Sequence, residues 1–261
     1  MNCRSEGSAA PALTHLSLFS GIGGLDLAAE WAGFTSVGQC EWADFPTKIL
    51  EKHWPDVPKW RDIHELTGED FRARTGLRTV DVISGGFPCQ PFSVAGKQEG
   101  KEDERYLWPE MLRVIAELKP SFVVGENVPG ILRIAASDVV ESLEREGYEC
   151  VLFDFEAAAV GAHHRRERIA FVAHTKGAGI QRHIELCVPK QAEGRREMQP
   201  HTSYGTEGRL YKWIPEPDVG RVANGVPDRV DRIKALGNAV VPQQFYPIFR
   251  AIAEELRRGS T

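Results

Sequence analysis

Short apolar runs alternate with helix-like segments along most of this 261-residue chain, and this alternation constrains its fold more than any other feature. Strands separated by helices of about ten residues are typical of βαβ units, whose strands lie mainly parallel in one sheet. The sequence therefore predicts an α/β protein with a doubly wound, mainly parallel sheet. We expect strands at residues 14–20, 37–41, 80–84, 121–125, 149–155 and 169–173, and helices at 25–31, 45–53, 108–118, 137–146 and 245–258.

The composition is that of a globular protein, with 42% hydrophobic and 26% charged residues, and it excludes wholesale disorder. No run of 18 apolar residues occurs, so we expect no membrane span, and the N-terminus lacks the apolar segment of a secretory signal. Five scattered cysteines without a Cys-x-x-Cys pair argue against a disulfide framework and a structural zinc site. They favour a reducing, cytoplasmic compartment.

Charge is unevenly distributed along the chain. Residues 165–212 contain ten basic and five acidic residues, so this segment carries +5 while the remainder carries −10. A basic segment of this kind suits a polyanionic partner, although a solvated basic surface explains it equally well. Apolar periodicity also fades between about residues 174 and 218, a stretch too long for an ordinary loop. It forms either a small irregular lobe or a partly disordered insert.

A glycine-rich loop follows the first predicted strand and leads into the first helix, with the sequence Phe19-Ser20-Gly21-Ile22-Gly23-Gly24. Glycines at this place let the backbone turn tightly and approach a ligand. Glu41 ends the second strand about 20 residues later, where a carboxylate is suited to binding two ribose hydroxyls. A plain tight turn is the alternative for the loop alone. The G-x-G-G spacing differs from the dinucleotide pattern and argues against NAD and a nucleoside-binding oxidoreductase.

Two further loops at predicted strand ends carry reactive groups. Cys89 lies between Pro88 and Pro91 after the strand at 80–84, and it is either a nucleophile or an incidental thiol. As a nucleophile it needs a nearby cation or dipole, because a free thiol is only slightly ionised at neutral pH. Glu126 follows an apolar run, so it is desolvated with a raised pKa, paired with a cation, or simply a cap for the next turn.

Arginines precede the last predicted strand in the sequence His163-His164-Arg165-Arg166-Glu167-Arg168. They suit a phosphate or a substrate oxygen. The adjacent histidines lack spaced partners, and we therefore expect no metal. Near the C-terminus, Gly237-Asn238 is typical of a turn in the left-handed conformation.

In this order the segments resemble the cytosine-C5 DNA methyltransferase family, as a compact bacterial or phage-type member, from about Leu16 to Gln244. The resemblance implies the mixed doubly wound sheet of S-adenosylmethionine-dependent methyltransferases, with S-adenosylhomocysteine as product. It places Glu41 and Trp42 on the ribose and adenine, and Asp62 and Ile63 on the adenine. The full cofactor set that it implies is Phe19, Ser20, Gly21, Ile22, Gly23, Gly24, Glu41, Trp42, Asp62, Ile63, Gly86, Pro88, Leu107, Asn238, Ala239 and Val240.

The resemblance also assigns the chemistry. Cys89 adds to C6 of a flipped cytosine, and a protonated Glu126 stabilises charge at N3. Arg168 holds the O2 edge, and Arg166 supports the loop or a phosphate. Residues 90–106 resemble the mobile loop that closes over the base. The DNA contacts that we expect are Gln90, Ser93, Arg105 and Arg165.

One departure from the family is His164, which stands where its arginine motif usually begins with Gln. The presumed target-recognition region is short, which predicts a short recognition sequence. We expect a catalytic domain of residues 14–173 plus 235–261, a recognition lobe at 174–234 and a flexible tail at 1–13. The expected partner is double-stranded DNA, with a cognate restriction endonuclease left open, no membrane, and a monomeric chain.

Two other functions remain open. A tRNA cytosine-5 methyltransferase would carry Cys-Phe-Thr in the variable region, whereas here Val188 follows Cys187. A catalytically inactive, cofactor-binding paralogue would lack the cysteine or the carboxylate, and both are present.

Overall fold

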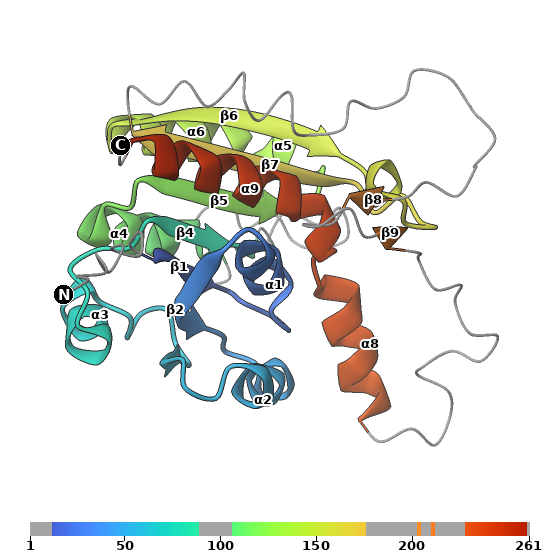
Figure 1. The fold of residues 1–261 in the computed structure, drawn as a ribbon, viewed down its shortest axis with the longest axis horizontal. Coiled ribbons are helices and arrows are strands. Elements are labelled where there is room, and N and C mark those ends of the chain that lie inside the picture. The colour runs from blue at the N-terminus through green and yellow to red at the C-terminus, as the bar shows by residue number, and fades with distance from the viewer. Residues whose placement is uncertain (1–11, 89–105, 176–202, 205–209, 212–227, 260–261) are drawn as a thin grey trace, which may run out of the picture.

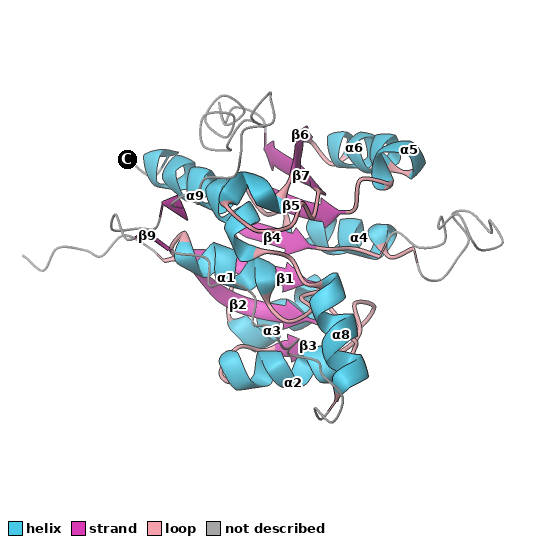
Figure 2. Cartoon of the chain, turned by 90° about the vertical axis from the view of Figure 1, so that its right-hand side faces the viewer, coloured by secondary structure: helices cyan, strands magenta, loops and turns pink. Residues whose placement is uncertain are grey.

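A seven-stranded sheet forms the centre of the computed structural model, which describes residues 12–88, 106–175, 203–204, 210–211 and 228–259. Its strand order is β3-β2-β1-β4-β5-β7-β6, which Figure 2 shows from β6 at the top to β3 at the bottom. The strands are β1 (Leu13–Leu18), β2 (Phe34–Cys40), β3 (Lys59–Trp60), β4 (Val82–Gly85), β5 (Phe122–Asn127), β6 (Tyr148–Phe155) and β7 (Arg168–Thr175). The first five are parallel, and β7 is antiparallel to both β5 and β6. The predicted α/β class with a mixed doubly wound sheet is confirmed.

Helices cover both faces of this sheet, and each face has its own apolar core. On one face α1 (Gly24–Trp31) packs against α9 (Pro242–Gly259) over β4, β5 and β7. On the other face lie α3 (Gly68–Thr75), α4 (Trp108–Leu118) and α6 (Ala136–Arg145). In Figure 1, α9 crosses in front of the sheet and α6 lies behind it. The remaining elements are α2 (Asp44–His53), α5 (Ile131–Ile134), a short 3-10 helix (Ala157–Val160), α8 (Arg229–Asn238), and a small pair of strands, β8 (Ser203–Tyr204) and β9 (Leu210–Tyr211).

The strand order reverses between β1 and β4. From β1 the chain moves outward to β2 and β3, and it then returns to β4 and continues to β5 on the other side. In open α/β sheets, ligands bind beyond the carboxyl ends of the strands at such a switch point. The loops that begin there are residues 19–24 after β1 and 86–88 after β4, so the topology places both predicted motifs at the ligand-binding edge.

The structure corrects the expectation of a left-handed turn at Gly237-Asn238. Both residues are helical and form the last turn of α8, which the sequence did not predict, and Ala239 follows in an extended conformation. The guanidinium of Arg166 donates hydrogen bonds to the carbonyl oxygens of Gly237 and Ala239. Because a side chain satisfies these carbonyl groups, the helix end does not need a left-handed glycine. Strand β3 and helix α5 were likewise not predicted, because they are short. Helix α3 was missed because it has no apolar stripe, with Phe71 as its only buried apolar side chain.

Within the described part of the chain, no helix is both long and apolar enough to cross a bilayer. The expected domain boundaries stay predictions, because most of 174–234 and residues 1–11 lie outside the described residues.

A buried carboxyl in α1 makes the stability of the fold depend on pH. Asp26 is completely buried and accepts a hydrogen bond from Gln39 Nε2 at 2.9 Å. Burial raises the pKa of Asp26 from 3.8 to about 6. A carboxyl whose pKa is higher in the folded state stabilises the fold below its unfolded pKa, and this contribution is lost as the pH rises towards 6.

Replacing Asp26 with Asn mimics the protonated form, so the variant should escape this loss. We expect its stability relative to the wild type to increase by about 2 kcal/mol between pH 4.5 and pH 8, measured by denaturant unfolding. Burial lowers the pKa of His15 to about 3, but that effect is common to both proteins and cancels in the comparison. A difference that stays constant with pH would contradict the assignment.

Candidate active site at the carboxyl edge of the sheet

The loop after β1 has an unusual backbone that depends on its glycines. Phe19, Gly21 and Gly23 have φ angles of 51°, 55° and 86°, in the left-handed region. Gly23 has a second constraint, because a Cβ there would lie 2.5 Å from the ring of Trp54. Ser20 fixes the loop to the end of β2, since its backbone N donates to Cys40 O at 3.0 Å. The loop is therefore held in one tight conformation at the head of α1.

Glu41 lies against this loop, as its predicted role requires. Its carboxylate accepts hydrogen bonds from the backbone N of Gly21 and of Ala43, each at 2.8 Å. A carboxylate has about four acceptor positions, so two remain for hydroxyl groups of a ligand. The neighbouring residue Trp42 is 72% exposed, which leaves its ring available for a planar group. Arg61 holds the Trp42 backbone by donating to its carbonyl oxygen at 2.7 Å.

Asp62 and Ile63 lie in the connection between β3 and α3. The Asp62 carboxylate accepts hydrogen bonds from His64 N at 2.9 Å and from His64 Nδ1 at 2.7 Å. These hydrogen bonds keep the pKa of Asp62 below its ordinary value, so it presents a charged acceptor. Ile63 is buried in the core on the α4 side of the sheet.

The C-terminal motif meets the glycine loop directly. A Cβ on Gly24 would lie 2.7 Å from the carbonyl oxygen of Val240, so only glycine permits this close approach. The segment formed by Ala239 and Val240 therefore borders the loop after β1, and the preceding turn, with Asn238, is tied to Arg166. The structure thus brings together the cofactor residues predicted at both ends of the chain.

Glu126 is buried in β5 and forms an ion pair with Arg168. The antiparallel pairing of β5 with β7 places Glu126 opposite Ala170, which brings the start of β7 to the end of β5. Arg168 Nε lies 2.7 Å from Glu126 Oε1, and the two side chains are 13% and 11% exposed. Burial raises the pKa of Glu126, although the charges of Arg168 and Arg166 oppose this rise. The strand extends two residues beyond its predicted end, so Glu126 belongs to the strand and is not a cap for the next turn.

The same carboxyl group touches the base of the loop that carries Cys89. A Cβ on Gly86 would lie 2.8 Å from Glu126 Oε2. Asn127, to which the sequence assigned no role, donates from Nδ2 to Phe87 O at 3.0 Å. Its amide holds the loop onto the end of β5. The signal in the sequence was its place directly after Glu126, in the segment Glu126-Asn127-Val128 that resembles the carboxylate motif of the family.

Several predicted site residues take no part in the contacts described above, or lie outside the described residues. Pro88 is exposed, Leu107 is half-buried against the core at the start of α4, and Arg165 is exposed with its Nε 3.9 Å from Glu156. Arg166 supports the end of α8, and buried Gln244, missed by the sequence reasoning, donates to Arg166 O at 2.9 Å. Within the described ranges no group of three or more potential metal ligands is present. Cys89, Gln90, Ser93 and Arg105 lie outside the described residues.

The chain is similar in sequence to known proteins. Residues 13–209 match the model of the C-5 cytosine-specific DNA methylases, a match that stops short of Val240. The chain is 34% identical over 208 residues to the type II methyltransferase M.NgoFVII of Neisseria gonorrhoeae, covering 77% of this chain and 53% of that protein. It is 35% identical over 189 residues to the type II methyltransferase M.FnuDI of Fusobacterium nucleatum, covering 70% and 53%.

Among solved structures, one titled as a DNA modification methyltransferase encoded within a prophage of E. coli is 29% identical with a TM-score of 0.55. That match covers 63% of this chain and 47% of the other. The chain spans about half the length of the curated relatives it matches. Because the family model covers more than half of its residues, the chain belongs to the C-5 cytosine-specific DNA methylase family, whose members use S-adenosylmethionine.

Proposed function

We propose that this chain transfers a methyl group from S-adenosylmethionine to C5 of a cytosine flipped out of duplex DNA. One observation carries the proposal. Glu126 is buried, paired with Arg168 and packed against Gly86, three residues before Cys89. A buried carboxyl group with a raised pKa, next to an arginine and at the base of the loop whose sequence contains a thiol, suits proton exchange with a pyrimidine ring.

The residues around the glycine loop fit the cofactor. Glu41 would bind the ribose hydroxyls, and Trp42 would cover one face of the adenine. The charged acceptor of Asp62 matches the exocyclic amine of adenine, and Ile63 adds an apolar contact. S-adenosylmethionine supplies an electrophilic methyl group, and S-adenosylhomocysteine is the product. The contact between Gly24 and Val240 supports one continuous cofactor site.

The base requires activation, because C5 of cytosine is a weak nucleophile. The Cys89 thiolate adds to C6, and Glu126 donates its proton to N3 as the ring becomes an enamine. Arg168 stabilises the O2 edge. After C5 has gained the methyl group, a base removes the C5 proton, the C6–S bond breaks and the thiolate leaves, and N3 returns its proton to the Glu126 carboxylate. The cytosine must first leave the duplex, which costs a few kcal/mol of stacking and pairing.

The proposed partner is duplex DNA, contacted by Gln90, Ser93, Arg105 and Arg165 and read by a recognition lobe within residues 174–234. The type II names of the relatives support a cognate restriction endonuclease as a further partner. The scattered cysteines favour the cytoplasm. We propose a monomer.

Incubation with tritiated S-adenosylmethionine and either duplex DNA or tRNA tests the function. We expect label in DNA, and bisulfite sequencing of a plasmid from an expressing strain should show methylated cytosines in one short context. Label in tRNA alone would favour the RNA-modifying alternative. Cofactor binding without transfer to any DNA would favour the inactive paralogue.

Replacing Gly86 with Ala should slow transfer, because the new methyl group would displace the Glu126 carboxyl. A displacement of about 1 Å in an active site costs roughly 100-fold in rate, and we expect a loss of this size in kcat. Gly130→Ala is the matched control, since the nearest atom to its Cβ is 4.0 Å away. Equal rates for both variants, measured with tritiated cofactor, would remove Glu126 from the base site.

A further inference from the structure

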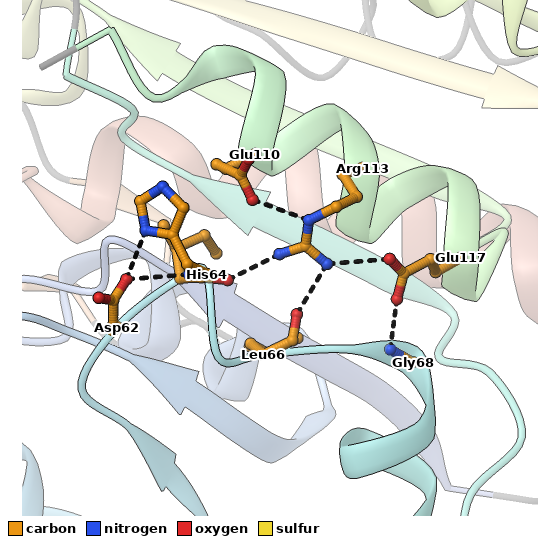
Figure 3. Close-up of polar contacts among 8 residues, drawn as sticks. Asp62, His64, Leu66, Gly68, Glu110, Arg113 and Glu117 are labelled. Carbon is orange, nitrogen blue, oxygen red and sulfur yellow. Dashed lines mark hydrogen bonds and ion pairs between the residues drawn. The ribbon is translucent and has the colours of Figure 1, made fainter. Parts of the chain in front are cut away.

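Arg113 on α4 belongs to none of the sequence motifs, yet its guanidinium joins two segments far apart in the sequence (Figure 3). On its own helix it meets two carboxylates, with Nε 2.7 Å from Glu110 Oε2 and Nη1 2.9 Å from Glu117 Oε1. Its side chain is 29% exposed. Two acidic partners in a partly buried place hold the guanidinium in a fixed orientation, because charged hydrogen bonds are stronger than neutral ones.

The guanidinium of Arg113 also donates hydrogen bonds to the connection between β3 and α3. Nη2 donates to Ile63 O at 2.8 Å, and Nη1 donates to Leu66 O at 3.1 Å. Glu117 adds a third link by accepting from Gly68 N at 2.5 Å. Backbone groups at two positions of this connection and at the first residue of α3 are therefore bound to one helix.

Helix α4 is a rigid support for these bonds. Its residues Trp108, Met111, Val114 and Ile115 are buried in the core, whereas the connection at 61–67 contains no helix or strand. Buried helices resist displacement, and short irregular segments take the position that their contacts impose. The side chains of Ile63 and Leu66 pack in the same core, and Arg113 fixes the backbone that carries Ile63, and Asp62 before it, relative to the sheet edge.

We infer that Arg113 is a positioning residue for recognition of the adenine of the methyl donor. This inference rests on the proposed function, because it assumes that Asp62 and Ile63 meet the adenine. Arg113 does not touch the cofactor. It holds the segment that contains Asp62 and Ile63, the proposed adenine contacts. Its loss should weaken binding and adenine recognition but leave the chemical step of the bound enzyme nearly intact.

The test compares the full-length wild type with Arg113→Met, Arg113→Lys and the control Arg145→Met, whose arginine is 74% exposed on α6. Calorimetry gives the affinities for S-adenosylhomocysteine and for S-inosylhomocysteine, in which an oxygen replaces the adenine amine. For Arg113→Met we expect roughly 10-fold weaker S-adenosylhomocysteine binding and a smaller preference over the inosine analogue. KM for S-adenosylmethionine should rise similarly, with kcat within about twofold.

Arg113→Lys keeps the charge but cannot reach both carbonyl oxygens, so it should recover part of the preference. If Arg113→Met fails to fold, Arg113→Lys takes its place in the comparison with the wild type. Unchanged affinity, or equal weakening of both ligands, would overturn the inference and leave Arg113 a structural residue. Failure of the wild type to methylate DNA while it binds S-adenosylhomocysteine would overturn the proposed function alone. Failure of the wild type to bind that ligand would overturn both.

Discussion

Replacing Cys89 with Ser is expected to abolish methyl transfer while leaving cofactor binding unchanged. A serine hydroxyl is a far weaker nucleophile than a thiolate at neutral pH, so C5 of cytosine stays unactivated. Loss of a nucleophile that acts in concert with other groups costs about 10⁴-fold or more in kcat. Single-turnover assays with tritiated S-adenosylmethionine measure the rate, and calorimetry with S-adenosylhomocysteine measures the binding.

The control for this experiment is Cys150→Ser. Burial raises the pKa of the Cys150 thiol to about 12, so it is inert at neutral pH and its replacement should preserve the rate. A second readout is a duplex containing 5-fluorocytosine, whose C5 fluorine cannot leave as a proton would. With methyl donor present it should become covalently attached at Cys89. Normal turnover by the Cys89 variant, or no attachment, would refute the mechanism.

The second large effect is expected for Glu126→Gln. Glutamine has the same shape but cannot give a proton to N3, and general acid catalysis contributes about 10²- to 10⁴-fold in rate. Because burial raises the pKa of Glu126, its protonated form persists to higher pH than that of an ordinary glutamate. The wild-type rate should therefore fall as the pH rises through this pKa, and the variant should lack that decline.

The pH profile of single-turnover rates distinguishes this role from a structural one. Glu141→Gln on the exposed side of α6 is the matched control and should keep the wild-type profile. The affinity of Glu126→Gln for S-adenosylhomocysteine should also be unchanged, because the proposed function places Glu126 against the base and not against the cofactor. A variant with the wild-type rate and profile would exclude proton donation by Glu126.

Much of the site could be predicted because the sheet is parallel where the motifs occur. Phe19, Glu41 and Gly86 each follow a recognisable apolar run, and the carboxyl ends of parallel strands meet at one edge. Their order along the chain was therefore enough to predict that they lie together. The carboxyl of Glu126 was also identified, and the structure selects between the alternatives for it: it is both desolvated and paired.

Contacts between a side chain and distant backbone could not be predicted in this way. Arg113 and Asn127 bind carbonyl oxygens of Ile63 and Phe87, and every residue has such an oxygen, so no residue type marks the partner. In the sequence Arg113 is simply a polar position of an amphipathic helix. The contacts of Arg166 could not be predicted for the same reason, because its guanidinium binds the carbonyl oxygens of Gly237 and Ala239 at the end of α8.

The position of β7 has a consequence for shortened forms of the chain. Among the described strands, β6 pairs with β7, and β5 pairs with β7 on the side away from β4. A product that stops before Arg168 would lose more than the arginine that pairs with Glu126. It would leave one side of β5, whose six residues are all buried, as an open sheet edge with unpaired amide and carbonyl groups. Such an edge can recruit strands from other molecules, so premature termination should yield aggregates rather than an inactive but intact enzyme.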